Sequence, residues 1–263
     1  MTAGRPRRSR EIVVDRLAGL LVGFCHGEEV AGGLTSPGRA SRAMFDAVEH
    51  LRRGDRHLER PWLGAEEPRD LALAMAVPVA AKILPRALDD FDLVNAGWLD
   101  HLVGMVVDHA VDARDLGIAR SVVHNIATRL LGSLVDGFDP RTSAFPPQPP
   151  AVVEIHHALM HSLVLDVDAA PGSVLRTTVD AFDLVRRHPS PEDACNAAAS
   201  TRPTVAALAL GLLGATHGLA VLPPPASDAE LMAIGLAHVL DGAGTDMDDL
   251  ARNPSTGPRP ALS

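Results

Sequence analysis

The chain has 263 residues, of which 46% are hydrophobic and only 3% are aromatic, and it contains no tyrosine. A core built mainly from Ala, Leu and Val favours closely packed helices over strands, which prefer aromatic and β-branched residues. We therefore predict an all-α fold. The net charge of −9 excludes a general nucleic-acid binder, because phosphate binding needs a concentrated positive surface.

Targeting signals and metal motifs are weak in this sequence. The two cysteines, Cys25 and Cys195, are too few for a disulfide framework, and they lack the Cys/His spacing of a zinc site. The basic residues at the start are not followed by an apolar run that ends in small residues, so we predict no signal peptide. We expect a cytoplasmic protein.

The predicted elements are almost all helices. Residues 1–10 form a basic segment that we expect to be disordered, and the Gly-rich stretch 26–39 predicts a loop. Residues 139–150 are rich in proline and indicate either a boundary between two lobes or, as we assign them, a surface loop within one domain at 11–242. Residues 243–263 predict a disordered tail. From apolar spacing, helices are expected over 11–25, 40–53, 69–84, 92–111, 112–132, 151–165, 173–187, 191–199, 204–221 and 227–241.

The stretch from Thr204 to Leu222 carries no formal charge and is nearly long enough to span a membrane. Its modest Ala/Gly/Leu composition is more typical of a buried helix in a globular protein. Gly211, Gly214 and Gly218 recur along one side, where a neighbouring backbone can approach closely. We predict a central core helix and no membrane contact.

Three segments resemble the ADP-ribosylglycohydrolase family, in the family's order. "DRLAGLLVGFCHGEEVAG" at 15–32 is similar to its N-terminal D-R-x-x-G-x-L-L-G-x-x-x-G-D-A-x-G pattern, and "LALAMAVPVAAKILP" at 71–85 is similar to A-M-R-x-A-P-L-G-L. Residues 171–224 resemble the family's run of helices around its G-G-D-T-D-T motif. The resemblance implies a compact, orthogonal multi-helix domain that acts on ADP-ribosyl bonds.

The resemblance also implies a pair of Mg²⁺ or Mn²⁺ ions held by acids, which this chain has lost. Hard divalent ions need oxygen ligands. Counting back from Gly214 and Gly218 aligns G-G-D-T-D-T with residues 199–204, so Thr201 and Pro203 replace the two acids and Arg202 lies between them. The family's T-D-D-T motif falls on residues 38–42, which contain arginines and no carboxylate. The family's dinuclear site is therefore not expected, and Mg²⁺ or Mn²⁺ would bind only at a rebuilt site.

The arginines at these positions predict an anion-binding cleft, since a guanidinium presents a planar fork to phosphate or carboxylate groups. The candidate ligand-binding residues are Glu28, Arg39, Arg42, Arg202 and Thr204. The alternative is that the arginines simply face solvent in an abandoned cleft. Glu28 is also the candidate general base or internal partner of an arginine, although exposed loop glutamates at 28 and 29 are the simpler interpretation.

A relocated metal site is the remaining candidate for chemistry. Glu154, His157 and His161 lie at i, i+3 and i+7 on one predicted helical face, a spacing that can supply ligands to Zn²⁺. Packed or exposed histidines are the alternative interpretation.

Three functions from different classes stay open. The first is a non-catalytic family member that binds ADP-ribose or another anionic nucleotide in a regulatory role. The second is an enzyme, a metal-independent or relocated-metal ADP-ribosyl or N-glycosyl hydrolase. The third is a helical interaction protein, a homodimer or a subunit with a protein partner, in which the cleft is vestigial.

Overall fold

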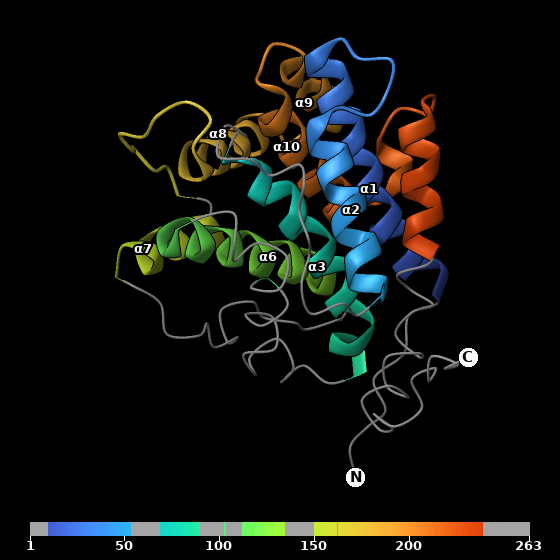
Figure 1. Cartoon of the computed structure of the whole chain (residues 1–263), viewed down its shortest axis with the longest axis horizontal. Helices are drawn as coiled ribbons and strands as arrows, with labels where there is room; N and C mark the ends of the chain where they lie inside the picture. The colour runs from blue at the N-terminus through green and yellow to red at the C-terminus, as the bar shows by residue number, and fades with distance from the viewer. Residues whose placement is uncertain are drawn as a thin grey trace, which may run out of the picture.

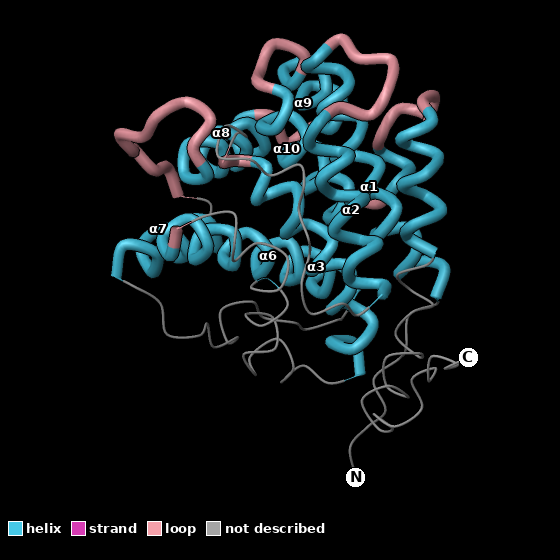
Figure 2. The backbone as a smooth tube through the Cα atoms, in the orientation of Figure 1, coloured by secondary structure: helices cyan, strands magenta, loops and turns pink. Residues whose placement is uncertain are grey.

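Every regular element that the structure describes is helical. The computed structural model describes residues 10–53, 69–89, 103, 112–134, 150–161 and 163–238. Helices and no strands occur in these ranges, which confirms the all-α prediction for them (Figures 1 and 2). The elements are α1 (Arg10–Gly32), α2 (Arg39–Arg53), α3 (Leu71–Asp89), α6 (Ala113–Leu134), α7 (Pro150–Met160), α8 (Val174–Arg187), α9 (Pro191–Ala198), α10 (Pro203–His217) and the short 3-10 helix η2 (Leu219–Val221). Residues 228–238 form a further helix.

Helices α1 and α10 form the centre of the core. They run antiparallel and touch through glycines, because a Cβ built on Gly19 would lie 2.5 Å from the Gly214 carbonyl oxygen, and one on Gly23 would lie 2.3 Å from that of Leu210. Every residue from Val205 to Ala215 is buried. The predicted burial of this helix is therefore confirmed, and its small residues serve backbone contact with α1.

Helix α10 ends earlier than the predicted boundary at 221. Gly218 has a φ of +90°, which side chains rarely tolerate, and a Cβ there would collide with Asp15. The Asp15 carboxylate accepts a hydrogen bond from the Leu219 N–H at 3.1 Å, which satisfies a backbone donor after the break. No helix among the described residues is long and apolar enough to cross a membrane.

The prediction of a loop over 26–39 was wrong for its first half. Helix α1 continues from the predicted end at 25 through Gly32. Gly27 does not break the helix, because its bare Cα lies against the Ala206 carbonyl, where a Cβ would come within 2.3 Å of the oxygen. Glu28 and Glu29 are 3% and 8% exposed, so the interpretation as exposed loop glutamates was also wrong.

The remaining helices surround this central pair. Helix α3 packs against both α2 and α6, α6 packs against α7, and α8 packs against α10. In Figure 1, α6 and α7 run across the direction of α1 and α2, and α9 lies near the top of the view. Helices α2, α3, α6, α8 and α9 cover the predicted segments with shifts of a few residues at their ends, whereas α7 ends at Met160 and not at 165.

Several predictions fall outside the described residues. These are the basic segment, apart from Arg10, most of the helix expected over 92–111, the Pro-rich loop apart from Pro150, and the tail after 242. The predicted domain boundaries therefore stay predictions.

Candidate functional site

Arg202 lies at the start of α10, and two aspartates hold its side chain in place. Its Nη1 atom lies 3.6 Å from Asp70 Oδ2 and its Nη2 atom lies 3.4 Å from Asp180 Oδ2. Nη2 also donates a hydrogen bond to Thr177 Oγ1 at 3.1 Å, and the Thr177 hydroxyl donates to Asp70 Oδ2 at 3.0 Å. We expected the partner of this arginine to be an anion or an internal acid such as Glu28. Internal acids do pair with Arg202, but they come from the turn before α3 and from α8, so the choice of Glu28 was wrong.

Asp70 is the buried member of this group, with 4% of its surface exposed. Burial raises the pKa of its carboxyl, and hydrogen bonding by Thr177, the charge of Arg202 and hydrogen bonding by Thr204 lower it in part. Thr204 therefore acts as a partner of Asp70. The side chains of Arg202 and Thr204, predicted as ligand-binding residues, meet at one carboxylate.

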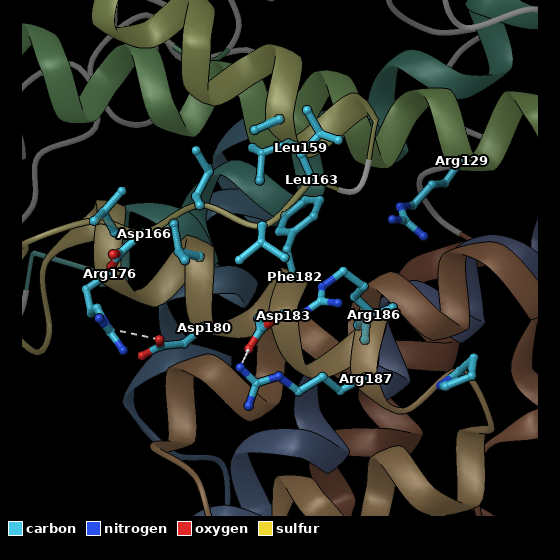
Figure 3. A pocket seen from close by; sticks show the side chains of 17 residues that line it. Arg129, Leu159, Leu163, Asp166, Arg176, Asp180, Phe182, Asp183, Arg186 and Arg187 are labelled. Carbon is cyan, nitrogen blue, oxygen red and sulfur yellow. Dashed lines mark hydrogen bonds and ion pairs between the residues drawn. The ribbon is translucent and has the colours of Figure 1, made fainter.

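A cavity of about 660 Å³ opens between α8 and the turn that joins α9 to α10. We call it the α8–α10 cavity. Three arginines reach its wall: Arg176 and Arg187 from α8, and Arg202 from the N-cap of α10. Asp180 and Asp183 line it as well, and they pair with Arg176 at 2.8 Å and with Arg187 at 2.6 Å (Figure 3). The cavity is large enough for a small organic ligand and has a wall of alternating charge.

Glu28 has a structural role at the start of α2. Its two carboxylate oxygens accept hydrogen bonds from the backbone N–H groups of Ala40 and Ser41, each at 2.7 Å. The first N–H groups of a helix have no partner within the helix, and an acid there also favours the helix dipole. A Cβ on Gly38 would lie 2.3 Å from the Glu28 carboxylate, so glycine leaves the space that this contact needs. Glu28 does not line the α8–α10 cavity.

Arg39 and Arg42 lie in the first turn of α2 and are exposed. The Nε–H of Arg42 donates to the Gly38 carbonyl at 3.2 Å. Neither arginine lines the α8–α10 cavity. The structure thus brings Arg202 and Thr204 together, and it leaves Glu28, Arg39 and Arg42 as a separate group around the start of α2.

The candidate zinc ligands are exposed: Glu154 and His157 lie on α7, and His161 lies in the turn directly after it. Glu154, His157 and His161 are all exposed, and the rings of His157 and His161 lie with their centroids 4.3 Å apart. Over the described ranges, no group of three or more His, Cys, Asp or Glu side chains is placed to hold a metal ion.

A second pair of buried acids, Glu29 and Glu230, was not predicted from the sequence, because residues 26–39 were interpreted as a loop. Glu29 accepts a hydrogen bond from the Ser227 hydroxyl at 2.8 Å, and Glu230 lies 2.7 Å from His26 Nδ1. Burial raises the pKa of the Glu29 carboxyl, the Ser227 hydrogen bond lowers it in part, and the nearby Glu230 raises it further. These contacts tie the helix over 228–238 to α1.

The residues that pair with the cavity arginines had a detectable sequence signal. Arg176 and Asp180, and likewise Asp183 and Arg187, are four residues apart, which places opposite charges next to each other on a helix.

Comparisons of the chain with protein-family profiles, curated proteins and solved structures found no match.

Proposed function

We propose that this chain is a divergent ADP-ribosylglycohydrolase-like protein that binds ADP-ribose or a related anionic nucleotide without hydrolysing it by the two-metal route. The all-helical fold and the central packing of the two glycine-rich helices are consistent with the motif resemblance. The lack of acids at Thr201 and Pro203 supports a pseudoenzyme. A regulatory or sensing role follows from binding without turnover.

The gathering of three guanidinium groups on the wall of one cavity carries this proposal. Arg202 is the central one, because it lies at the N-cap of α10 and its side chain is 33% exposed. Its Nη2 atom makes the hydrogen bonds to Thr177 and Asp180, and its Nε and Nη1 atoms donate none to any described residue. A guanidinium has five N–H donors, so donors remain for a phosphate.

The aspartates that pair with Arg202 do not block this role. Charge-assisted N–H to carboxylate contacts are strongest at about 2.7 to 2.9 Å. The two contacts of Arg202 are longer, at 3.4 and 3.6 Å. A diphosphate can therefore gain shorter contacts to Arg202 while Asp70 keeps its hydrogen bond from Thr177. The aspartates hold the guanidinium in place in the free protein.

Calorimetric titration with ADP-ribose tests the proposal. Hydrogen bonds to charged groups contribute about 1.5 to 3 kcal/mol, so Arg202→Ala should weaken binding by roughly ten- to a hundredfold. Arg186→Ala is the matched control, because Arg186 also pairs with an aspartate but does not line the α8–α10 cavity. Arg42→Ala should bind ADP-ribose like the unchanged protein, because Arg42 does not line the α8–α10 cavity.

An interaction protein is the second candidate, and one observation favours it. Leu231 and Met232 are adjacent on the helix over 228–238 and are 57% and 51% exposed. Large exposed apolar side chains on a surface helix can form part of a contact with another protein. If ADP-ribose and ADP do not bind at millimolar concentration, the nucleotide proposal is wrong. Sedimentation of the unchanged chain and of Met232→Glu would then test for a dimer through this helix.

A further inference from the structure

A second cavity also borders α8, shares some of its ion-paired side chains with the α8–α10 cavity, and has a larger apolar part. It measures about 660 Å³ and is lined by side chains of α7, the segment 163–167 and α8, with Arg129 of α6 at one end (Figure 3). We call it the α7–α8 cavity. Much of its wall is apolar, and this part includes Leu159, Leu163, Val164, Phe182 and Val185.

Arg129 of α6 brings a positive charge to one end of this cavity. Its Nε–H donates to Asn125 Oδ1 at 2.7 Å, and its Nη1 donates to Thr216 Oγ1 at 3.4 Å. Its guanidinium carbon lies 5.8 Å from the centre of the Phe182 ring. All three partners are uncharged. Within the part of the chain that the structure describes, no carboxylate pairs with Arg129.

The other arginines of the cavity are matched by acids. Arg176 pairs with Asp180, and Arg186 and Arg187 share Asp183. Asp166 also lines the cavity, but Figure 3 shows it at the opposite end from Arg129. Among the arginines that line this cavity, Arg129 is therefore the one without a carboxylate partner in the described ranges. Removing a cation from water without an opposite charge is unfavourable, so this position favours an anion.

We propose that the α7–α8 cavity binds an aliphatic carboxylate, with the carboxylate at Arg129 and the chain against the leucines and valines of α7, the segment 163–167 and α8. The apolar wall provides the surface that an alkyl chain would bury, and the planar guanidinium matches a carboxylate. The volume falls in the range of small-molecule sites, which combine an apolar lining with a few polar groups. This inference goes beyond the nucleotide proposal, because it uses neither Arg202 nor the α8–α10 cavity.

Calorimetric titration with sodium decanoate tests the inference, with decanol and acetate as comparison ligands. We expect decanoate to bind, and decanol and acetate to bind at least about tenfold more weakly, because each lacks one half of the recognised chemistry. Arg129→Met removes the charge and keeps the apolar length, and it should weaken decanoate binding by about tenfold or more. Arg202→Ala should leave decanoate binding unchanged, so the two proposals fail separately.

A variant at the exposed edge of the α7–α8 cavity tests the same inference if Arg129→Met does not fold. Leu163 is 53% exposed and lines the cavity, so Leu163→Asp should fold normally and weaken decanoate binding. Val153 is 48% exposed on α7 and does not line the cavity, which makes Val153→Asp the matched control. The inference is wrong if decanoate fails to bind at millimolar concentration, if decanol binds as tightly, or if neither Arg129→Met nor Leu163→Asp weakens binding.

Discussion

The Glu28 carboxylate joins two helices, because it lies on α1 and accepts its hydrogen bonds from the first turn of α2. Removing it leaves the N–H groups of Ala40 and Ser41 buried without this acceptor. A hydrogen bond to a charged group contributes about 1.5 to 3 kcal/mol. We expect Glu28→Ala to lower the free energy of unfolding by about that amount, measured by urea denaturation.

Glu154→Ala is the control for this change, since Glu154 is exposed on α7 and should alter stability little. Glu28→Gln keeps an amide oxygen as an acceptor, so its loss should be smaller than that of Glu28→Ala. If Glu28→Ala unfolds at the same urea concentration as the unchanged chain, the carboxylate does not stabilise α2. Loss of ADP-ribose binding in a stably folded Glu28→Gln would instead support the earlier ligand-binding assignment.

Arg202 could be selected from the sequence, but its partners could not. The motif resemblance pointed to residues 199–204, and Arg202 was conspicuous there because a cation replaced the expected acids. Asp70 and Asp180 approach it only through the packing of α3, α8 and α10, which local spacing does not encode. The same limit applies to Arg129, whose contact with Thr216 joins residues far apart in the sequence.

At the scale of elements, α1 and α10 can pack this closely only because glycines without side chains lie at their contact. A Cβ on Gly214 would lie 1.9 Å from the Gly19 carbonyl oxygen, and backbone cannot move aside as a flexible side chain can. Gly214→Ala should therefore push the helices apart. Overpacking of this kind costs roughly 1 to 3 kcal/mol, so we expect a lower midpoint of thermal unfolding.

Gly235→Ala is the matched control for the glycine contact. Gly235 lies in the helix over 228–238 and has no atom within 4 Å of a built Cβ. Alanine favours a helix over glycine by about 1 kcal/mol, so this variant should be as stable as the unchanged chain or more so. A Gly214→Ala variant that gains stability in the same way would contradict close packing of α1 on α10.

The extent of α1 shows why element boundaries were harder to predict than element type. The stretch after Cys25 contains several glycines and two glutamates, a composition typical of loops. In the folded chain, Gly27 is needed for contact with α10, and the glutamates bind the start of α2 and Ser227. Tertiary contacts therefore stabilise a helix that local propensity does not favour. Helices with clear apolar spacing, such as α2 and α8, were predicted to within a few residues.

At the scale of the whole molecule, the starts of α2, α3 and α10 meet beside the last turns of α1. Glu28 binds the start of α2, Gly27 packs on α10, and Asp70 before α3 pairs with Arg202. Helix α8 contributes to both cavities, which share Arg176, Asp180, Asp183 and Arg187. A ligand in one cavity would therefore touch the ion pairs that line the other.

The charge at this meeting point also predicts how the folded chain responds to divalent cations. A dinuclear site needs several oxygen ligands at one place, but Arg202 occupies the space beside Asp70 and Asp180, and Thr201 and Pro203 supply no carboxylate. A ligand that binds only the folded state, present at a hundred times its dissociation constant, stabilises that state by about 2.7 kcal/mol. We expect no such gain: the thermal unfolding midpoint should be the same in millimolar Mg²⁺, in millimolar Mn²⁺ and in chelator. ADP-ribosylated arginine peptides should release no ADP-ribose under any of these conditions. A midpoint that rises with Mn²⁺ and no longer rises in Asp70→Asn would place a metal site among the acids that hold Arg202, and the proposal of a metal-free binding protein would then be wrong.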